Sequence, residues 1–178
     1  MKKKILQVKL FSETACFIFI ITSITAAMAF AYFYLQKTLG LPPCPLCIVD
    51  RLALILVALT LITGWVLSVC SSGKTYIIRH YTYLLNGLWL ALGLWASGRH
   101  VFLQRFSSES GSCVPIIHPD ILDLLTRAFA GTSNCNAILW TVMGWSIAEQ
   151  TLLLFVLLSL LHIRLFYIAW SRDGSHGR

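Results

Sequence analysis

The chain has 178 residues, of which 57% are hydrophobic and only 12% are charged, and its formal net charge is +7. A chain this apolar is not an ordinary water-soluble domain, and its length fits one compact unit. The basic residues lie mainly at the ends of apolar runs, which argues against nucleic-acid binding and predicts membrane lipid as the surroundings.

Four apolar segments predict membrane-spanning helices. No charged residue lies between positions 13 and 37 or between positions 51 and 74, and a helix needs roughly 20 residues to cross the hydrocarbon core. A third uncharged run, between His80 and Arg99, is slightly shorter. The sequence therefore predicts an all-α membrane protein, a four-transmembrane-helix bundle formed by one domain, residues 1–178. The predicted spans are about 15–35, 48–70, 81–99 and 147–167, and the predicted outer loops are about 36–47 and 100–146.

The first span follows a basic stretch, Lys2-Lys3-Lys4, and contains the triplets Ala27-Met28-Ala29 and Ala29-Phe30-Ala31. This arrangement resembles a secretory signal with a cleavage site. The apolar run is longer than a usual signal core, so we favour a retained helix. Cleavage would leave the sidedness of the downstream chain unchanged.

The fourth span contains three ionisable residues, Glu149, His162 and Arg164. The sequence Ser146-Ile147-Ala148-Glu149 is typical of a capping box, in which the glutamate satisfies the first turn of the helix. The other two lie near the far end, from where long side chains can reach water. We therefore keep this segment as a span.

Lysine and arginine are distributed unequally between the two ends of the predicted helices. Nine of the fourteen belong to the two chain termini and to the loop around Lys74, and five are spread over the remaining sequence. The positive-inside rule then predicts that both termini and the Lys74 loop are cytoplasmic, and that the other two loops face outward.

The six cysteines divide between these two sides. Cys16 and Cys70 lie near the cytoplasmic ends of the first and second spans, where we interpret them as small apolar residues in helices. Disulfides persist in oxidising compartments, which the outer side provides. Four cysteines are predicted there: Cys44, Cys47, Cys113 and Cys135.

The two cysteines of the first outer loop, Cys44 and Cys47, are separated by two residues. A disulfide between them closes a very small loop and removes little unfolded-state entropy, so it is a poor structural staple. Redox exchange is the favoured interpretation. A structural disulfide and half of a metal site stay open, although the 21 residues between Cys113 and Cys135 do not match the usual zinc spacing.

Arg51 lies one helical turn after Cys47 at the mouth of the second span. An arginine at the edge of the hydrocarbon is costly unless it reaches water or has a function. It can stabilise a thiolate or donate hydrogen bonds to a carbonyl acceptor, or anchor the helix at the interface beside Asp50. Arg99 and His100, at the outer end of the third span, are predicted to border the same site.

The second outer loop contains a short amphipathic segment, from Pro119 to Ala130. Its apolar residues follow helical spacing, and Pro119 and Gly131 suit the first position and the cap of a helix. We predict a short amphipathic interfacial helix on the membrane surface or on the outer face of the protein itself. Cys113 and Cys135 then flank this helix on flexible arms.

Three stretches carry a resemblance to a known family. They are Cys44-Pro45-Leu46-Cys47-Ile48-Val49-Asp50-Arg51, Gly98-Arg99-His100-Val101-Phe102-Leu103-Gln104, and Asn134-Cys135 followed by Trp140. With four spans and two outer loops, the chain resembles the DsbB family, the bacterial inner-membrane proteins that generate disulfides.

The resemblance implies a protein-dithiol:quinone oxidoreductase of the bacterial inner membrane, with cytoplasmic termini and periplasmic redox loops. The pair Cys113 and Cys135 would accept electrons from a periplasmic thioredoxin-fold protein of the DsbA type, with the mixed disulfide on Cys113. The pair Cys44 and Cys47 would relay them to bound ubiquinone or menaquinone, with Cys47 facing the quinone and Arg51 assisting. No metal is expected.

Two residues depart from the usual family pattern. Pro45 stands where relatives often carry another apolar residue, and Asp50 stands where a longer acid or amide is common. Two alternatives stay open. One is a sister branch of the family that serves a dedicated partner, and the other is a membrane protein with two static disulfides that resist mild reductant.

Overall fold

The computed structural model describes residues 2–41, 43–70, 75–106, 138 and 140–173. The first helix, α1 (Lys2–Ala29), continues directly into a π-helix, η1 (Phe30–Thr38). Two long helices follow, α2 (Pro45–Cys70) and α3 (Thr75–Phe106). A two-stranded hairpin, β1 (Thr141–Val142) and β2 (Trp145–Ser146), leads into the last helix, α5 (Ile147–Asp173).

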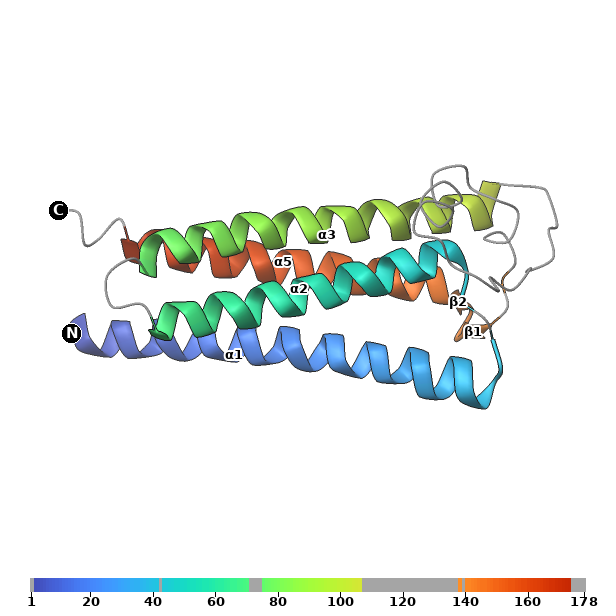
Figure 1. Ribbon diagram of the computed structural model, residues 1–178, viewed down its shortest axis with the longest axis horizontal. Helices are drawn as coiled ribbons and strands as arrows, with labels where there is room; N and C mark the ends of the chain where they lie inside the picture. Colours follow the sequence, from blue (N-terminus) through green and yellow to red (C-terminus); the bar gives the residue numbers. More distant parts are fainter. Residues whose placement is uncertain (1, 42, 71–74, 107–137, 139, 174–178) are drawn as a thin grey trace.

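The four long helices lie side by side as an elongated bundle (Figure 1). Helix α3 packs against both α2 and α5, and α1 contacts α2 and α5. Helix α1 begins and α5 ends at the same end of the bundle, whereas α2 begins, α3 ends and the hairpin lies at the opposite end. This second end, which we call the hairpin end, carries the cysteine pair of the first outer loop.

Three helices in the described part of the chain are long and apolar enough to cross a membrane. They are Thr14–Thr38, Pro45–Cys70 and Ile147–Ser171, and each contains one of the predicted spans 15–35, 48–70 and 147–167. Helix α3 contains the predicted span 81–99 but is not among them, because its central stretch is rich in Tyr, Trp and Gly and includes Asn86. The fourth span therefore stays a prediction.

Apolar side chains cover the outside of the bundle as well as its core. Leu84, Leu160 and Val69 are largely exposed although they lie in the middle or the last turns of long helices. Exposed apolar surface of this extent fits a lipid environment and would be costly in water. The chain is thus a multi-pass membrane protein, and the part that the structure describes is helical apart from the short hairpin and the connecting residues.

The contact between α3 and α5 depends on a close approach at Gly93. A Cβ atom built on Gly93 would lie 2.0 Å from Cε1 of Phe155, whose side chain is fully buried. Small residues at helix crossings allow such approach in membrane bundles. The glycine therefore fixes how closely α5 packs on the helix that carries His100.

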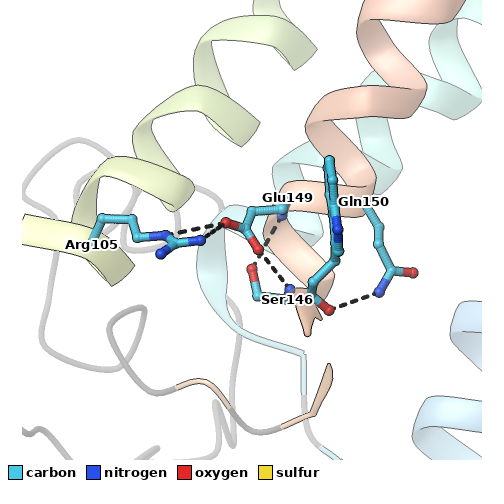
Figure 2. A network of polar contacts seen from close by, with 5 residues as sticks. Arg105, Ser146, Glu149 and Gln150 are labelled. Carbon is cyan, nitrogen blue, oxygen red and sulfur yellow. Dashed lines mark hydrogen bonds and ion pairs between the residues drawn. The ribbon is translucent and has the colours of Figure 1, made fainter. Parts of the chain in front are cut away.

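The capping box predicted at the start of the fourth span is confirmed (Figure 2). The backbone N–H of Ser146 donates to Glu149 Oε2 at 2.8 Å, and the Glu149 N–H donates to Ser146 Oγ at 3.3 Å. The guanidinium of Arg105, at the end of α3, also donates to Glu149 Oε1, with Nε at 3.1 Å. This contact ties the last turn of α3 to the first turn of α5.

The predicted interfacial helix between Pro119 and Ala130 lies outside the described residues. The same holds for Cys113 and Cys135. Those predictions stay predictions.

Candidate dithiol site and its cavity

The pair Cys44 and Cys47 straddles the start of α2. Pro45 is the first residue of the helix, a position that tolerates proline because the first backbone N–H groups have no partner within the helix. Cys44 immediately precedes it, so its sulfur lies at the positive end of the helix dipole. The backbone N–H of Cys47 donates to Cys44 Sγ at 3.3 Å.

No disulfide joins Cys44 and Cys47 in this structure, and their sulfur atoms lie 2.9 Å apart. Both side chains are partly buried. The first helical turn thus holds the two sulfurs together, as disulfide formation between them requires.

His100 brings an imidazole from α3 against both sulfurs. Its Nε2 lies 3.7 Å from Cys44 Sγ, and its Nδ1 lies 4.0 Å from Cys47 Sγ. The side chain is 4% exposed. One turn further along α3, the Nε2 atom of Gln104 lies 3.5 Å from His100 Nε2. These contacts between segments more than 50 residues apart follow from the packing of α3 on α2.

A cavity of about 110 Å³ opens beside this cluster. Its polar lining residues come from the start of α2 and the end of α3: Cys44, Cys47, Asp50, Arg51, His100 and Gln104. Most of its other lining residues are apolar and include Ala27, Met28, Ala31, Leu35, Ile147 and Leu154, from α1, η1 and α5. The cavity therefore suits a ligand with a polar edge and an apolar body.

Trp140, just before the hairpin, forms an aromatic part of the cavity wall. Its ring lies 5.6 Å from that of Phe30 and 5.7 Å from that of Tyr34, measured between centroids. Phe30 and Tyr34 belong to η1, and their own rings stack at 5.2 Å. The π-helix thus presents two aromatic rings to the chain segment that precedes α5.

The structure brings together four of the residues that the sequence predicts for the site: Cys44, Cys47, Arg51 and His100. Arg99 is not among the residues that line this cavity, although it adjoins His100 in the chain. Gln104 also lines the cavity, although the sequence predicts no role for it. It lies four residues after His100, a spacing that places both side chains on the same face of a helix. In the sequence, Trp140 belongs to one of the stretches that resemble the family but has no role assigned at the site.

The cluster also contains three metal-ligating groups. Among the described residues, the donor atoms of Cys44, Cys47 and His100 all lie within 4.8 Å of one another. The cysteine spacing alone disfavoured zinc, but the third donor here is a histidine from another helix. The expected absence of a metal is therefore untested.

The cysteine pair contacts an imidazole at the end of a membrane-spanning helix, and it lies beside a partly polar cavity. This arrangement is the one expected of a membrane-embedded thiol oxidoreductase. The comparisons with known proteins agree with this class. The sequence profile of the family described as "Disulfide bond formation protein DsbB" matches residues 13–165.

Similar proteins extend over nearly the whole chain. A disulfide bond formation protein B of Psychrobacter arcticus is 36% identical over 172 residues, which cover 91% of this chain and 92% of the relative. One from Albidiferax ferrireducens is 34% identical over 170 residues, covering 92% and 93%. No solved structure matches the chain. The chain belongs to the DsbB family, and it is a membrane oxidoreductase of disulfide-bond formation.

Proposed function

We propose that this protein is a protein-dithiol:quinone oxidoreductase that reoxidises a periplasmic thiol oxidant of the DsbA type. The observation that carries this proposal is that Cys44 and Cys47 form part of the wall of a cavity between membrane-spanning helices. A lipid-soluble electron acceptor bound in this cavity can contact the sulfur atoms of the pair and accept their electrons.

The residues of the cavity fit a quinone. The apolar lining residues suit the ring face and its hydrocarbon tail, and the polar lining residues offer hydrogen-bonding groups for the ring oxygens. The Oε1 atom of Gln104 is buried and has no hydrogen-bond partner among the described residues, although such an acceptor is costly to leave unsatisfied. A bound quinone supplies an acceptor for two electrons and two protons.

The two cysteine pairs act in series. The disulfide between Cys113 and Cys135 accepts two electrons from the thiols of the periplasmic partner, which becomes oxidised. The dithiol so formed reduces the disulfide between Cys44 and Cys47, and the Cys44–Cys47 dithiol would then supply two electrons and two protons to a quinone bound in the cavity. Each exchange requires a thiolate as the attacking group.

The side chains around the inner pair have separate tasks. His100, in contact with both sulfurs, takes up a thiol proton as the thiolate forms. Arg51 would donate hydrogen bonds to a carbonyl oxygen of a bound quinone, and Gln104 would accept one from its reduced form. Arg99, predicted at the same site, lies one residue before His100 and supplies positive charge at the end of the span.

We further propose that α3 is the fourth span of a single domain, residues 1–178, in the bacterial inner membrane. The start of α1 and the end of α5 lie at one end of the bundle (Figure 1), and nine of the fourteen lysines and arginines belong, by sequence, to the two chain termini and the stretch around Lys74. Both termini are then cytoplasmic by the positive-inside rule. The hairpin end and the dithiol face the periplasm, where the partner is found.

The test is quinone reduction by the purified protein in detergent, with a reduced DsbA-type protein as the donor. Cys47→Ala should abolish quinone loss, because the relay lacks one of its two sulfurs. Cys70→Ala, at the other end of the same helix, should leave the rate unchanged. Undiminished turnover in Cys47→Ala would refute the proposal, as would inactive wild type with both ubiquinone and menaquinone and with a second donor.

A further inference from the structure

We propose that the reduced pair Cys44 and Cys47, together with His100, forms an open binding site for a thiophilic divalent cation such as Zn²⁺. The site exists only while both cysteines are thiols, and its occupant holds the protein in the reduced state. This inference goes beyond the proposed electron transfer, and it rests on the donor geometry rather than on turnover.

The donor atoms are close to the spacing that zinc imposes. Zinc binds sulfur at about 2.3 Å and imidazole nitrogen at about 2.0–2.1 Å with tetrahedral angles, so bound sulfur and nitrogen lie about 3.6 Å apart. The distance between Cys44 Sγ and His100 Nε2 is 3.7 Å. The sulfurs, at 2.9 Å, must separate to about 3.8 Å. Because Cys44 precedes the first residue of α2, a small rotation of its side chain can provide this separation.

The chemistry of the three donors selects a soft or borderline cation. Two cysteines with two residues between them, at the start of a helix, form a common half of zinc sites, and a histidine from a distant segment completes three protein ligands. Two thiolates neutralise a divalent charge, and Asp50 and Arg51, of opposite charge, line the same cavity. The charges of Asp50 and Arg51 offset each other, so the cavity can accommodate the neutral complex of the cation with two thiolates.

The fourth coordination position faces the cavity. All three donors line that space, and a tetrahedral cation with three protein ligands keeps one position for water or another small ligand. Zinc sites with this arrangement exchange their fourth ligand, unlike closed structural sites with four protein ligands. The cation would thus occupy the edge of the space that the acceptor uses.

Binding is coupled to the redox state of the pair. Each thiol loses its proton to solvent when its sulfur ligates the cation, so one cation releases two protons and no electrons move. A disulfide has no thiolate to offer, and the oxidised pair cannot bind in this way. Conversely, the ligated sulfurs cannot join to each other until the cation leaves. Zinc therefore traps the reduced enzyme.

The test uses full-length protein in which four cysteines, Cys16, Cys70, Cys113 and Cys135, are replaced by serine. The purified protein is titrated in detergent with Co²⁺, whose thiolate-to-metal absorption reports sulfur ligation, and with Zn²⁺ in competition with a chromophoric chelator. The reduced protein should bind one equivalent, and the same protein with its pair oxidised should bind none. Neither quinone nor partner is present, so the result is independent of electron transfer.

The histidine ligand is tested by His100→Ala, which should weaken Zn²⁺ binding about tenfold or more and change the Co²⁺ spectrum. His80→Ala, on the same helix but near the opposite end of the bundle, is the matched control and should bind as before. Thermal unfolding establishes that both variants are folded. Equal binding by the reduced and oxidised protein, or unchanged affinity and spectrum in folded His100→Ala, would overturn the proposal.

Discussion

The close approach of α3 and α5 gives a stability prediction with an internal control on one helix. A Cβ atom on Gly93 would lie 2.0, 2.3 and 2.6 Å from three ring atoms of Phe155. That ring is fully buried, so it cannot move aside without opening the helix contact. A Cβ atom on Gly98, less than two turns away, would meet nothing within 4 Å.

To a first approximation, Gly93→Ala differs from Gly98→Ala only in that its new methyl group clashes with Phe155. The gain in helix propensity on replacing glycine, up to about 1 kcal/mol, applies to both variants and cancels in the difference. Overpacking of a dense core typically costs about 1–3 kcal/mol. We therefore expect Gly93→Ala to have a free energy of unfolding about 1–3 kcal/mol lower than that of Gly98→Ala.

Unfolding by sodium dodecyl sulfate in mixed micelles, followed by far-ultraviolet circular dichroism, measures this difference. A second comparison isolates the partner: in a Phe155→Leu background the ring atoms are absent, and the cost of Gly93→Ala should shrink. Equal stability of the two alanine variants would refute the packing argument. So would a penalty at Gly93 that persists in full without the ring.

Three further predictions concern the hairpin end. Trp140→Ala should raise the quinone KM about two- to tenfold, since aromatic contacts are worth about 0.5–1.5 kcal/mol, while Trp145→Ala, which does not line the cavity, should leave KM unchanged in steady-state assays. Met143→Asn should raise the thermal unfolding temperature, because residue 143 has a φ of 51°, which asparagine tolerates better than methionine; a lowered temperature would contradict this. Glu149→Gln should destabilise less than Glu149→Ala in the same measurement, because glutamine retains the capping box and loses only the charge that faces Arg105; equal losses would contradict it.

Features with a local signal were predictable from the sequence. The capping box depends on residues three positions apart, and it was predicted correctly. The pair Cys44 and Cys47 is held by one helical turn, so its spacing already indicated that the sulfurs would be close. The apolar runs likewise located all four long helices. Three of these are apolar enough to cross a membrane, whereas α3 is less apolar because of its aromatic and glycine-rich centre.

Features that depend on packing between helices were not predictable in the same way. The sequence predicts that His100 borders the site because it lies at the outer end of the third span, but its contact with both sulfurs depends on how α3 packs on α2. Nothing in the residues 30–38 signals a π-helix, which widens the turn and presents Phe30 and Tyr34 to Trp140. The need for glycine at position 93 could not be predicted, because it depends on the Phe155 ring of another helix that packs against it.

The central claim is that electrons leave the protein from Cys44 and Cys47 into a quinone in the adjoining cavity. The most direct test is a single turnover by the variant that keeps only these two cysteines, reduced in advance and mixed with quinone in the absence of any partner. We predict that one quinone is reduced for each dithiol oxidised and that Cys47→Ala removes the reaction. A stable dithiol in the presence of both ubiquinone and menaquinone would contradict the claim.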